Sequence, residues 1–397
     1  MLETASAIES LERRLRGAGR RPRLVSVTFE APIADPSAAV FGSRLASDSW
    51  FAWEQPDRGG FALAGLGCAH ESLARGEGRF ADLDAECARL IGGRIGDEPP
   101  GAPAGSGPVW VGGFAFDPGG GSEPQWSSFP PARLSCPELA ILRVEGRSWV
   151  TLSARTGPEG PEAILARLRG RLEMLGERAM PILDPPQTGH TRIINPRPPG
   201  RYEGAVAAAV ERIAAGGLEK VVLAREVVVE TPRAHDSAAV FGALRELFPT
   251  CYCFCAGTPE AAFLGASPEL LVRRRGAGAA TVGLAGSTRR SADPAVDDHL
   301  GERLRVSVKN RAEHDIVVRR IARELGRHAV WVEAASDPEI VKVANIQHLG
   351  TPIHAQLAEP HSAIELAGLL HPTPAVGGEP GEPALAAIAE LEGLDRG

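Results

Sequence analysis

Lysine is scarce in this chain, and the position of one lysine suggests chemistry. Only three of the 43 basic residues are lysines, at positions 220, 309 and 342. Arginine keeps its proton in a protein, whereas a partly desolvated lysine can lose its proton and act as a base. Lys220 opens the sequence Lys-Val-Val-Leu-Ala-Arg, which is typical of a buried strand. Its side chain therefore lies either at a solvent-exposed strand end or in a pocket. In a pocket, it would be a candidate general base.

Two glutamates and a stretch of small residues are the next candidates. A single long helix predicted over Asp297–Leu325 places Glu302 and Glu313 within about 20° of each other around its axis. Glu313 also follows Lys309 by four residues, the spacing of a helical ion pair. Such a pair is usually a solvated face, so the spacing alone does not establish a site.

The segment Thr281–Arg290 reads as a strand that ends in small residues and two arginines. Backbone amides of such a turn can bind a carboxylate, because no side chain shields them. A plain β-turn followed by solvated arginines explains the same residues, and on this segment alone we favour it.

Composition limits the classes of partner. The net charge of -7 argues against a general nucleic-acid binder, which needs a basic face. No apolar run approaches the roughly 20 residues that span a bilayer, so we expect a cytoplasmic protein without a membrane partner. The arginines between Arg13 and Arg23 predict an amphipathic surface helix rather than a targeting peptide. Cys251, Cys253 and Cys255 alternate as one buried face of a strand would, rather than as a metal site.

Short β-type runs separated by glycine and proline predict a large, mostly antiparallel sheet in the first half of the chain. These runs are 24–30, 50–53, 60–65, 109–116 and 138–143. Helices are predicted at Glu71–Ile91 and Pro161–Arg178, where apolar residues recur at helical spacing.

Proline clusters at 184–200 predict a connection between an N-terminal lobe, 1–183, and a C-terminal region, 201–397. The elements expected after it are helices at 202–215 and 237–247, strands at 219–230, 251–255 and 263–272, and the long helix described above. Glu269 is expected to follow a turn and open another strand.

Six motifs in one order resemble those of a known family. They are Lys-Val-Val-Leu-Ala-Arg (220–225), Gly-Ala-Ser-Pro-Glu (265–269), Leu-Ala-Gly-Ser (284–287), Glu-His (313–314), Gln-His-Leu (347–349) and His-Pro-Thr-Pro-Ala-Val-Gly-Gly (371–378). This set is similar to that of the chorismate-utilising enzymes, and among them the isochorismate synthases. The resemblance is firm from about residue 200 onward and looser before it.

The resemblance implies an α/β (α+β) fold in which two mostly antiparallel, curved sheets pack together with helices outside. It implies that the chain binds chorismate and Mg2+ and forms isochorismate, an isomerisation shared by menaquinone and siderophore biosynthesis. Water adds at ring carbon C2 while the C4 hydroxyl leaves. Relatives that make anthranilate carry glutamine in place of Lys220 and use ammonia, so no glutaminase subunit is expected here.

The resemblance also implies residue roles. Lys220 matches the base that activates water, and Glu269 matches the acid that protonates the leaving hydroxyl. Glu313 matches a Mg2+ ligand. The residues that match the substrate-binding positions are Gly286, Ser287, His348 and Ala375.

The sequence departs from the family pattern at its C-terminal end. In the family, a further segment follows with two strands, an arginine for the substrate carboxylate and a second glutamate for Mg2+. That segment is not in these 397 residues, so a complementary C-terminal chain is one expectation and a shortened or inactive protein is another. Two alternative functions remain: a salicylate synthase of the same family, and a non-catalytic chorismate-binding protein.

Overall fold

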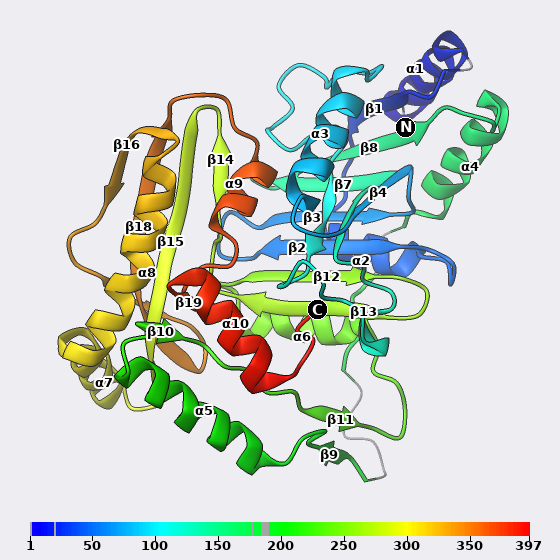
Figure 1. The fold of residues 1–397 in the computed structure, drawn as a ribbon. Coiled ribbons are helices and arrows are strands. Elements are labelled where there is room, and N and C mark those ends of the chain that lie inside the picture. The colour runs from blue at the N-terminus through cyan, green and yellow to red at the C-terminus, as the bar shows by residue number, and fades with distance from the viewer. Residues whose placement is uncertain (1, 20, 177, 184–189) are drawn as a thin grey trace. The chain divides into compact units, whose positions relative to one another are not determined.

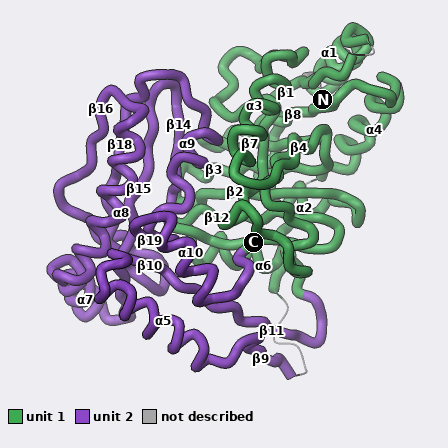
Figure 2. Tube along the Cα trace, in the orientation of Figure 1, with its two compact units in different colours: residues 1–185, 235–268, 397 green, residues 186–234, 269–396 purple. Residues whose placement is uncertain are grey.

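The computed structural model describes residues 2–19, 21–176, 178–183 and 190–397. Contacts divide the chain into two units, shown in Figure 2. Unit 1 comprises Met1–Pro185, His235–Pro268 and Gly397, and unit 2 comprises Pro186–Ala234 and Glu269–Arg396. Among the described residues, no helix is both long enough and apolar enough to span a membrane.

Unit 1 is built on a seven-stranded antiparallel sheet in the order β1-β8-β7-β3-β2-β12-β13 (Figure 1). Its strands are β1 (Leu24–Glu30), β2 (Trp50–Gln55), β3 (Phe61–Leu66), β7 (Leu139–Val144), β8 (Arg147–Arg155), β12 (Tyr252–Gly257) and β13 (Ala262–Ser267). A smaller sheet, in the order β4-β6-β5, contains β4 (His70–Ala74), β5 (Val111–Phe114) and β6 (Ala132–Cys136). The predicted antiparallel sheet is confirmed.

The helices of unit 1 bury apolar stripes. They are α1 (Leu2–Ala18), α2 (Pro36–Ser43), α3 (Arg79–Gly92), α4 (Pro161–Met174), α6 (Ser237–Leu247) and the short 3-10 helix η1 (Pro124–Trp126). Leu11 and Leu15 of α1 are fully buried whereas Arg13 and Arg16 are exposed, so the helix is amphipathic as predicted, but it ends at Ala18. The helix predicted over 71–91 is wrong in its first part, because residues 70–74 pair with β6 and the helix begins only after Gly76 and Gly78.

Unit 2 is organised around a second antiparallel sheet in the order β14-β15-β18-β16, with β17 also paired to β18. The strands are β14 (Arg273–Arg275), β15 (Gly278–Arg289), β16 (Ala329–Ala334), β17 (Glu339–Lys342) and β18 (Ile346–Leu357). Two-stranded pairs are formed by β10 (Lys220–Val221) with β19 (Gly378–Glu379), and by β9 (Arg192–Ile194) with β11 (Val228–Glu230). The helices are α5 (Pro199–Ala214), α7 (Pro294–Val306), α8 (Val308–Gly326), α9 (Ala363–Leu370) and α10 (Gly381–Glu392).

Helix α8 covers one face of this sheet, alongside β15 and β18 (Figure 1). Its fully or nearly fully buried residues Val317, Ile321 and Leu325 pack against Ile353 of β18. Burial of each such side chain contributes about 1.5–3 kcal/mol. This packing fixes the orientation of α8, which carries Glu313.

The single helix predicted over 297–325 is wrong, because the chain forms two helices there. Ser307 has an extended backbone, with φ -68° and ψ 113°, and its hydroxyl accepts from the backbone N–H of Asn310. A serine in this position is a favourable N-cap for a new helix. Glu302 and Glu313 therefore lie on different helices.

The strand predicted over 219–230 is also interrupted: only 220–221 and 228–230 are paired. The segment between them uses other partners; for example, the Ala224 N–H donates to the Glu392 carboxylate at 2.5 Å. Valine content predicted a continuous strand, but strand pairing depends on a neighbour that the local sequence does not specify.

The predicted connection at 184–200 stays a prediction, and residues 184–189 lie outside the described part of the chain. Strand β9 forms within its second half. Residues 235–268 follow the connection in sequence but belong to unit 1, because β12 pairs with β2.

Candidate active site

Lys220 begins the short strand β10, and a close backbone approach holds it there. Lys220 pairs with Glu379 and Val221 pairs with Gly378. A Cβ atom at Gly378 would lie 2.3 Å from the Lys220 carbonyl oxygen and 2.6 Å from Cβ of Ala384. Only glycine permits this approach, so the end of the Ala-Val-Gly-Gly motif positions the lysine.

The Lys220 side chain is buried, and the residue is 6% exposed. Its Nζ atom donates to the carbonyl oxygen of Pro374 at 2.7 Å and lies 3.4 Å from Oε1 of Glu313. Burial lowers the pKa of Lys220, while the carboxylates of Glu313 and Glu269 act in the opposite direction and the loss of solvent prevails. This burial excludes the solvent-exposed strand end, one of the two places that the sequence allowed.

Glu269 lies between β13 and β14 and does not open a strand as predicted. Burial raises the pKa of its carboxyl group, against the lowering effects of Thr373 and Lys220. The Thr373 hydroxyl donates to Oε1 of Glu269 at 3.5 Å. Lys220, which is buried, and Glu269, which is partly buried, thus have pKa values displaced toward each other, as a base and an acid working at one pH require.

The segment 371–378 joins these groups. Thr373 contacts Glu269, the Pro374 carbonyl accepts from Lys220, and the Ala375 N–H donates to the Thr373 hydroxyl at 3.3 Å. Sequence reasoning assigned only Ala375 a role. The prolines that flank Thr373 fix its backbone and were the available signal for the other two contacts.

Gly286 and Ser287 lie on a β-bulge within β15, so the predicted turn is wrong; of the two arginines predicted to be solvated, Arg289 is exposed and Arg290 pairs with Asp297. The pairing of β15 with β18 shifts between Ala285 and Ser287, and Gly286 adopts φ +75°. Any Cβ at Gly286 would lie 3.3 Å from Cβ of Asn310, which is one turn before Glu313 on α8. The bulge therefore faces the helix that carries the candidate metal ligand.

Ser287 and His348 form a polar pair across β15 and β18. The Ser287 hydroxyl and Nδ1 of His348 are 2.9 Å apart. Burial lowers the pKa of His348, so its ring is held neutral at ordinary pH. The exposed Ser287 hydroxyl remains accessible beside it.

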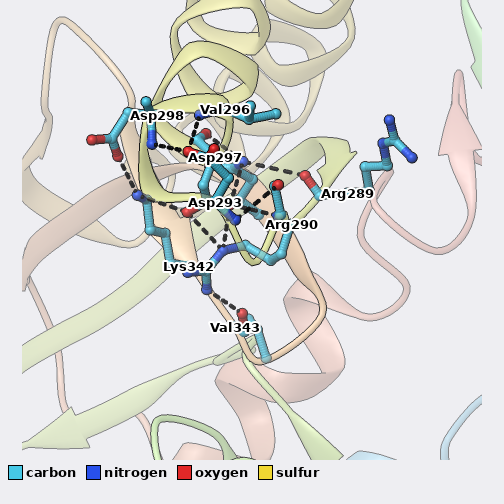
Figure 3. Close-up of polar contacts among 11 residues, drawn as sticks. Arg289, Arg290, Asp293, Val296, Asp297, Asp298, Lys342 and Val343 are labelled. Carbon is cyan, nitrogen blue, oxygen red and sulfur yellow. Dashed lines mark hydrogen bonds and ion pairs between the residues drawn. The ribbon is translucent and has the colours of Figure 1, made fainter.

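A network of charges supports the adjacent ends of β15 and β18 (Figure 3). Arg290 donates from Nε to both carboxylate oxygens of Asp297, at 2.8 and 3.0 Å, and Nζ of Lys342 lies 3.0 Å from the same carboxylate. These partners hold the pKa of Asp297 well below its usual range. Gln347, next to His348, donates to the Asp297 carbonyl at 3.1 Å. Lys342 is thus a structural lysine.

Glu313 is the candidate metal ligand among the described residues. Its carboxylate is 38% exposed and pairs with Lys220 rather than with Lys309 as predicted. Glu302 instead pairs with Arg305 at 2.8 Å, on α7. No group of three or more His, Cys, Asp or Glu side chains capable of holding a metal occurs within the described ranges. One carboxylate fits a Mg2+ ion that takes its other ligands from water and substrate oxygens.

Comparison with known proteins places this site in a family. The family model described as "Chorismate binding enzyme" matches residues 9–397. The chain belongs to the chorismate-binding enzyme family. This membership confirms the resemblance seen in the six motifs, and the expected mixed α/β fold with antiparallel sheets is confirmed as well.

Individual relatives of the family cover most of the chain. It is 35% identical to the "Salicylate biosynthesis isochorismate synthase" of Pseudomonas aeruginosa, over 95% of this chain and 77% of the relative. It is 29% identical to the "Isochorismate synthase MenF" of Bacillus subtilis, over 94% and 80% respectively. The solved structure of MenF, the menaquinone-specific isochorismate synthase from Escherichia coli, shares the fold with a TM-score of 0.77, 24% identity, and coverage of 99% and 85%.

Proposed function

We propose that this chain acts as an isochorismate synthase, an isomerase that converts chorismate to isochorismate. The observation that carries the proposal is the pair of Lys220, which is buried and has a lowered pKa, and Glu269, which is partly buried and has a raised pKa, in a chain 35% identical to a named isochorismate synthase. The relatives include proteins named for menaquinone and for salicylate biosynthesis.

Lys220 and Glu269 divide the proton transfers between them. Neutral Lys220 takes a proton from a water molecule whose oxygen bonds to C2 of the ring. The ring double bonds shift, the C4–O bond breaks, and Glu269 donates its proton to the departing hydroxyl. Water enters and leaves, so the net change is an isomerisation, and no ammonia or glutaminase subunit is needed.

Glu313 would hold Mg2+, together with water and the substrate carboxylate. The bound ion would neutralise and orient that carboxylate. The Lys220 ammonium lies 3.4 Å from Glu313 and competes with a cation for the same oxygen. Gly286, Ser287, His348 and Ala375 would border the substrate, with the exposed Ser287 hydroxyl and the neutral His348 ring as its polar contacts.

We also propose that a complementary segment, in the same or another chain, covers helix α5. Val206, Val210 and Ile213 form an apolar stripe on this helix and are 38%, 58% and 36% exposed. The Pseudomonas relative extends beyond the part that aligns with this chain, which spans 77% of it. A stripe of this kind normally packs against another element.

The test is incubation of the chain with chorismate and Mg2+, followed by separate assays for isochorismate, salicylate and pyruvate. Isochorismate without pyruvate supports the proposal. Salicylate with an equal amount of pyruvate would instead identify a salicylate synthase, for which no observation gives better support. Saturable chorismate binding without any product, also in the presence of the C-terminal part of the Pseudomonas relative, would identify a non-catalytic binding protein.

A further inference from the structure

Two histidine rings meet at the junction of α8 and α9, on residues that the proposed reaction does not use. His328 follows the end of α8, and His361 precedes Ser362, the N-cap of α9. Nδ1 of His328 and Nε2 of His361 are 3.3 Å apart. We propose that this pair is a binding site for a divalent transition-metal cation of the Zn2+ type.

The separation of the two nitrogens suits a shared ion. Two imidazole ligands at about 2.0–2.1 Å from a tetrahedral ion have nitrogens about 3.3–3.4 Å apart. The observed 3.3 Å equals this separation.

The ring orientations agree with convergence on one point. The ring planes are nearly perpendicular, at 87°, and the ring centroids are 4.8 Å apart. Rings placed end to end along the line between the two nitrogens would have more distant centroids, so at least one ring is tilted from this line. Tilted rings direct their lone pairs beside the line, where an ion bound to both would lie.

Glu365 lies beside the ring of His361. Its Oε2 atom lies 3.6 Å from Nδ1 of His361, the ring nitrogen that faces away from His328. The same oxygen accepts from the backbone N–H of Ser362 at 2.7 Å in a capping box, which fixes the carboxylate beside the ring. A carboxylate here favours the tautomer with the proton on Nδ1 and leaves the Nε2 lone pair free for a metal.

Both ligand-bearing segments are anchored. The His328 N–H donates to the Leu325 carbonyl at 3.0 Å, and the His328 carbonyl accepts from the Ala358 N–H at 2.9 Å. The ring of His361 is still 21% exposed, so solvent reaches the site. No third His, Cys, Asp or Glu side chain completes the set within the described residues, so water fills the remaining positions.

The ligand type determines which ions the site prefers. Imidazole suits Zn2+, Ni2+ and Cu2+, whereas Mg2+ prefers oxygen ligands, so the site is distinct from the one at Glu313. Without metal, the two rings share one N–H···N contact. On binding, the proton between them leaves Nδ1 of His328 and a proton is taken up at Nε2 of the same ring, so the number of protons on the pair is unchanged.

The test is calorimetric titration of the full chain with Zn2+ in excess Mg2+, which occupies oxygen sites. We expect one saturable Zn2+ site that is lost in His361→Ala and in His328→Ala. Glu365→Gln should weaken binding about tenfold or more, because it removes the charge behind His361. Glutamine still forms a capping box, so this variant keeps the helix start intact.

His354→Ala is the matched control, since His354 is an exposed histidine on β18. It should bind Zn2+ like the unaltered chain. Equal Zn2+ binding by the unaltered chain and by folded His361→Ala would overturn the proposal, as would the absence of any Zn2+ binding. Circular dichroism establishes whether each variant is folded. If either alanine variant is not folded, Zn2+ binding by Glu365→Gln equal to that of the unaltered chain would overturn the proposal.

Discussion

Replacement of Lys220 tests the proposed mechanism most directly. Lys220→Ala removes the base, and we expect kcat to fall by about 10²–10⁴-fold, the usual contribution of general base catalysis. This loss corresponds to about 3–5 kcal/mol in the activation barrier. KM for chorismate should change little, because the substrate contacts proposed for Ser287 and His348 are untouched.

The expected loss of kcat must be distinguished from a loss of folding. Lys220→Ala leaves the Pro374 carbonyl without its 2.7 Å donor, which costs about 1–3 kcal/mol of stability. Lys220→Arg keeps a cation and a donor but cannot give up a proton. If charge alone mattered, Lys220→Arg would stay active. Turnover within about tenfold of the unaltered enzyme, in either folded variant, would refute the base assignment.

The pH profile gives a second measure of the same pair. With ordinary pKa values of about 10.4 and 4.3, only about one enzyme in 10⁶ would hold neutral lysine and protonated glutamate together. Burial lowers the pKa of Lys220 and raises that of Glu269, and each unit by which the difference between them shrinks raises this fraction tenfold. We expect kcat/KM to rise with pH up to the pKa of Glu269, to stay level between the two pKa values, and to fall above the pKa of Lys220. Lys220→Ala should abolish the rise at low pH and leave only a fall in activity as Glu269 loses its proton.

Three further variants probe the supporting structure. Glu313→Gln should raise the Mg2+ concentration needed for half-maximal activity at least tenfold, while Glu302→Gln, on α7, should leave the Mg2+ titration unchanged. Asp297→Asn should lower Tm at pH 7 relative to the control Asp57→Asn, an exposed aspartate outside this network. Because the pKa of Asp297 is depressed in the fold, this difference should shrink as pH falls below about 4, and a constant difference would contradict the charge network. Gly286→Ala forces alanine to φ +75°, a strain of about 1–3 kcal/mol, and should raise KM for chorismate, whereas an unchanged KM would separate the bulge from the substrate site.

Local sequence predicted elements well where one pattern dominates. Helix α6 spans 237–247 as predicted, and the alternation around Cys253 and Cys255 gave a strand face that is at most 1% exposed. The long helix failed because one serine can cap a helix as readily as it can lie within one, and helical periodicity does not distinguish the two. The break separates Glu302 from Glu313.

The sequence by itself determined the family, through six ordered motifs, and singled out Lys220 by residue type. Only the tertiary structure decided what surrounds that lysine. Burial and electrostatics act through space, so the pairing of Lys220 with Glu313, 93 positions later in the chain, leaves no local signal. The same holds for the Pro374 carbonyl, because a backbone acceptor is present at every residue and only folding selects which one meets the lysine.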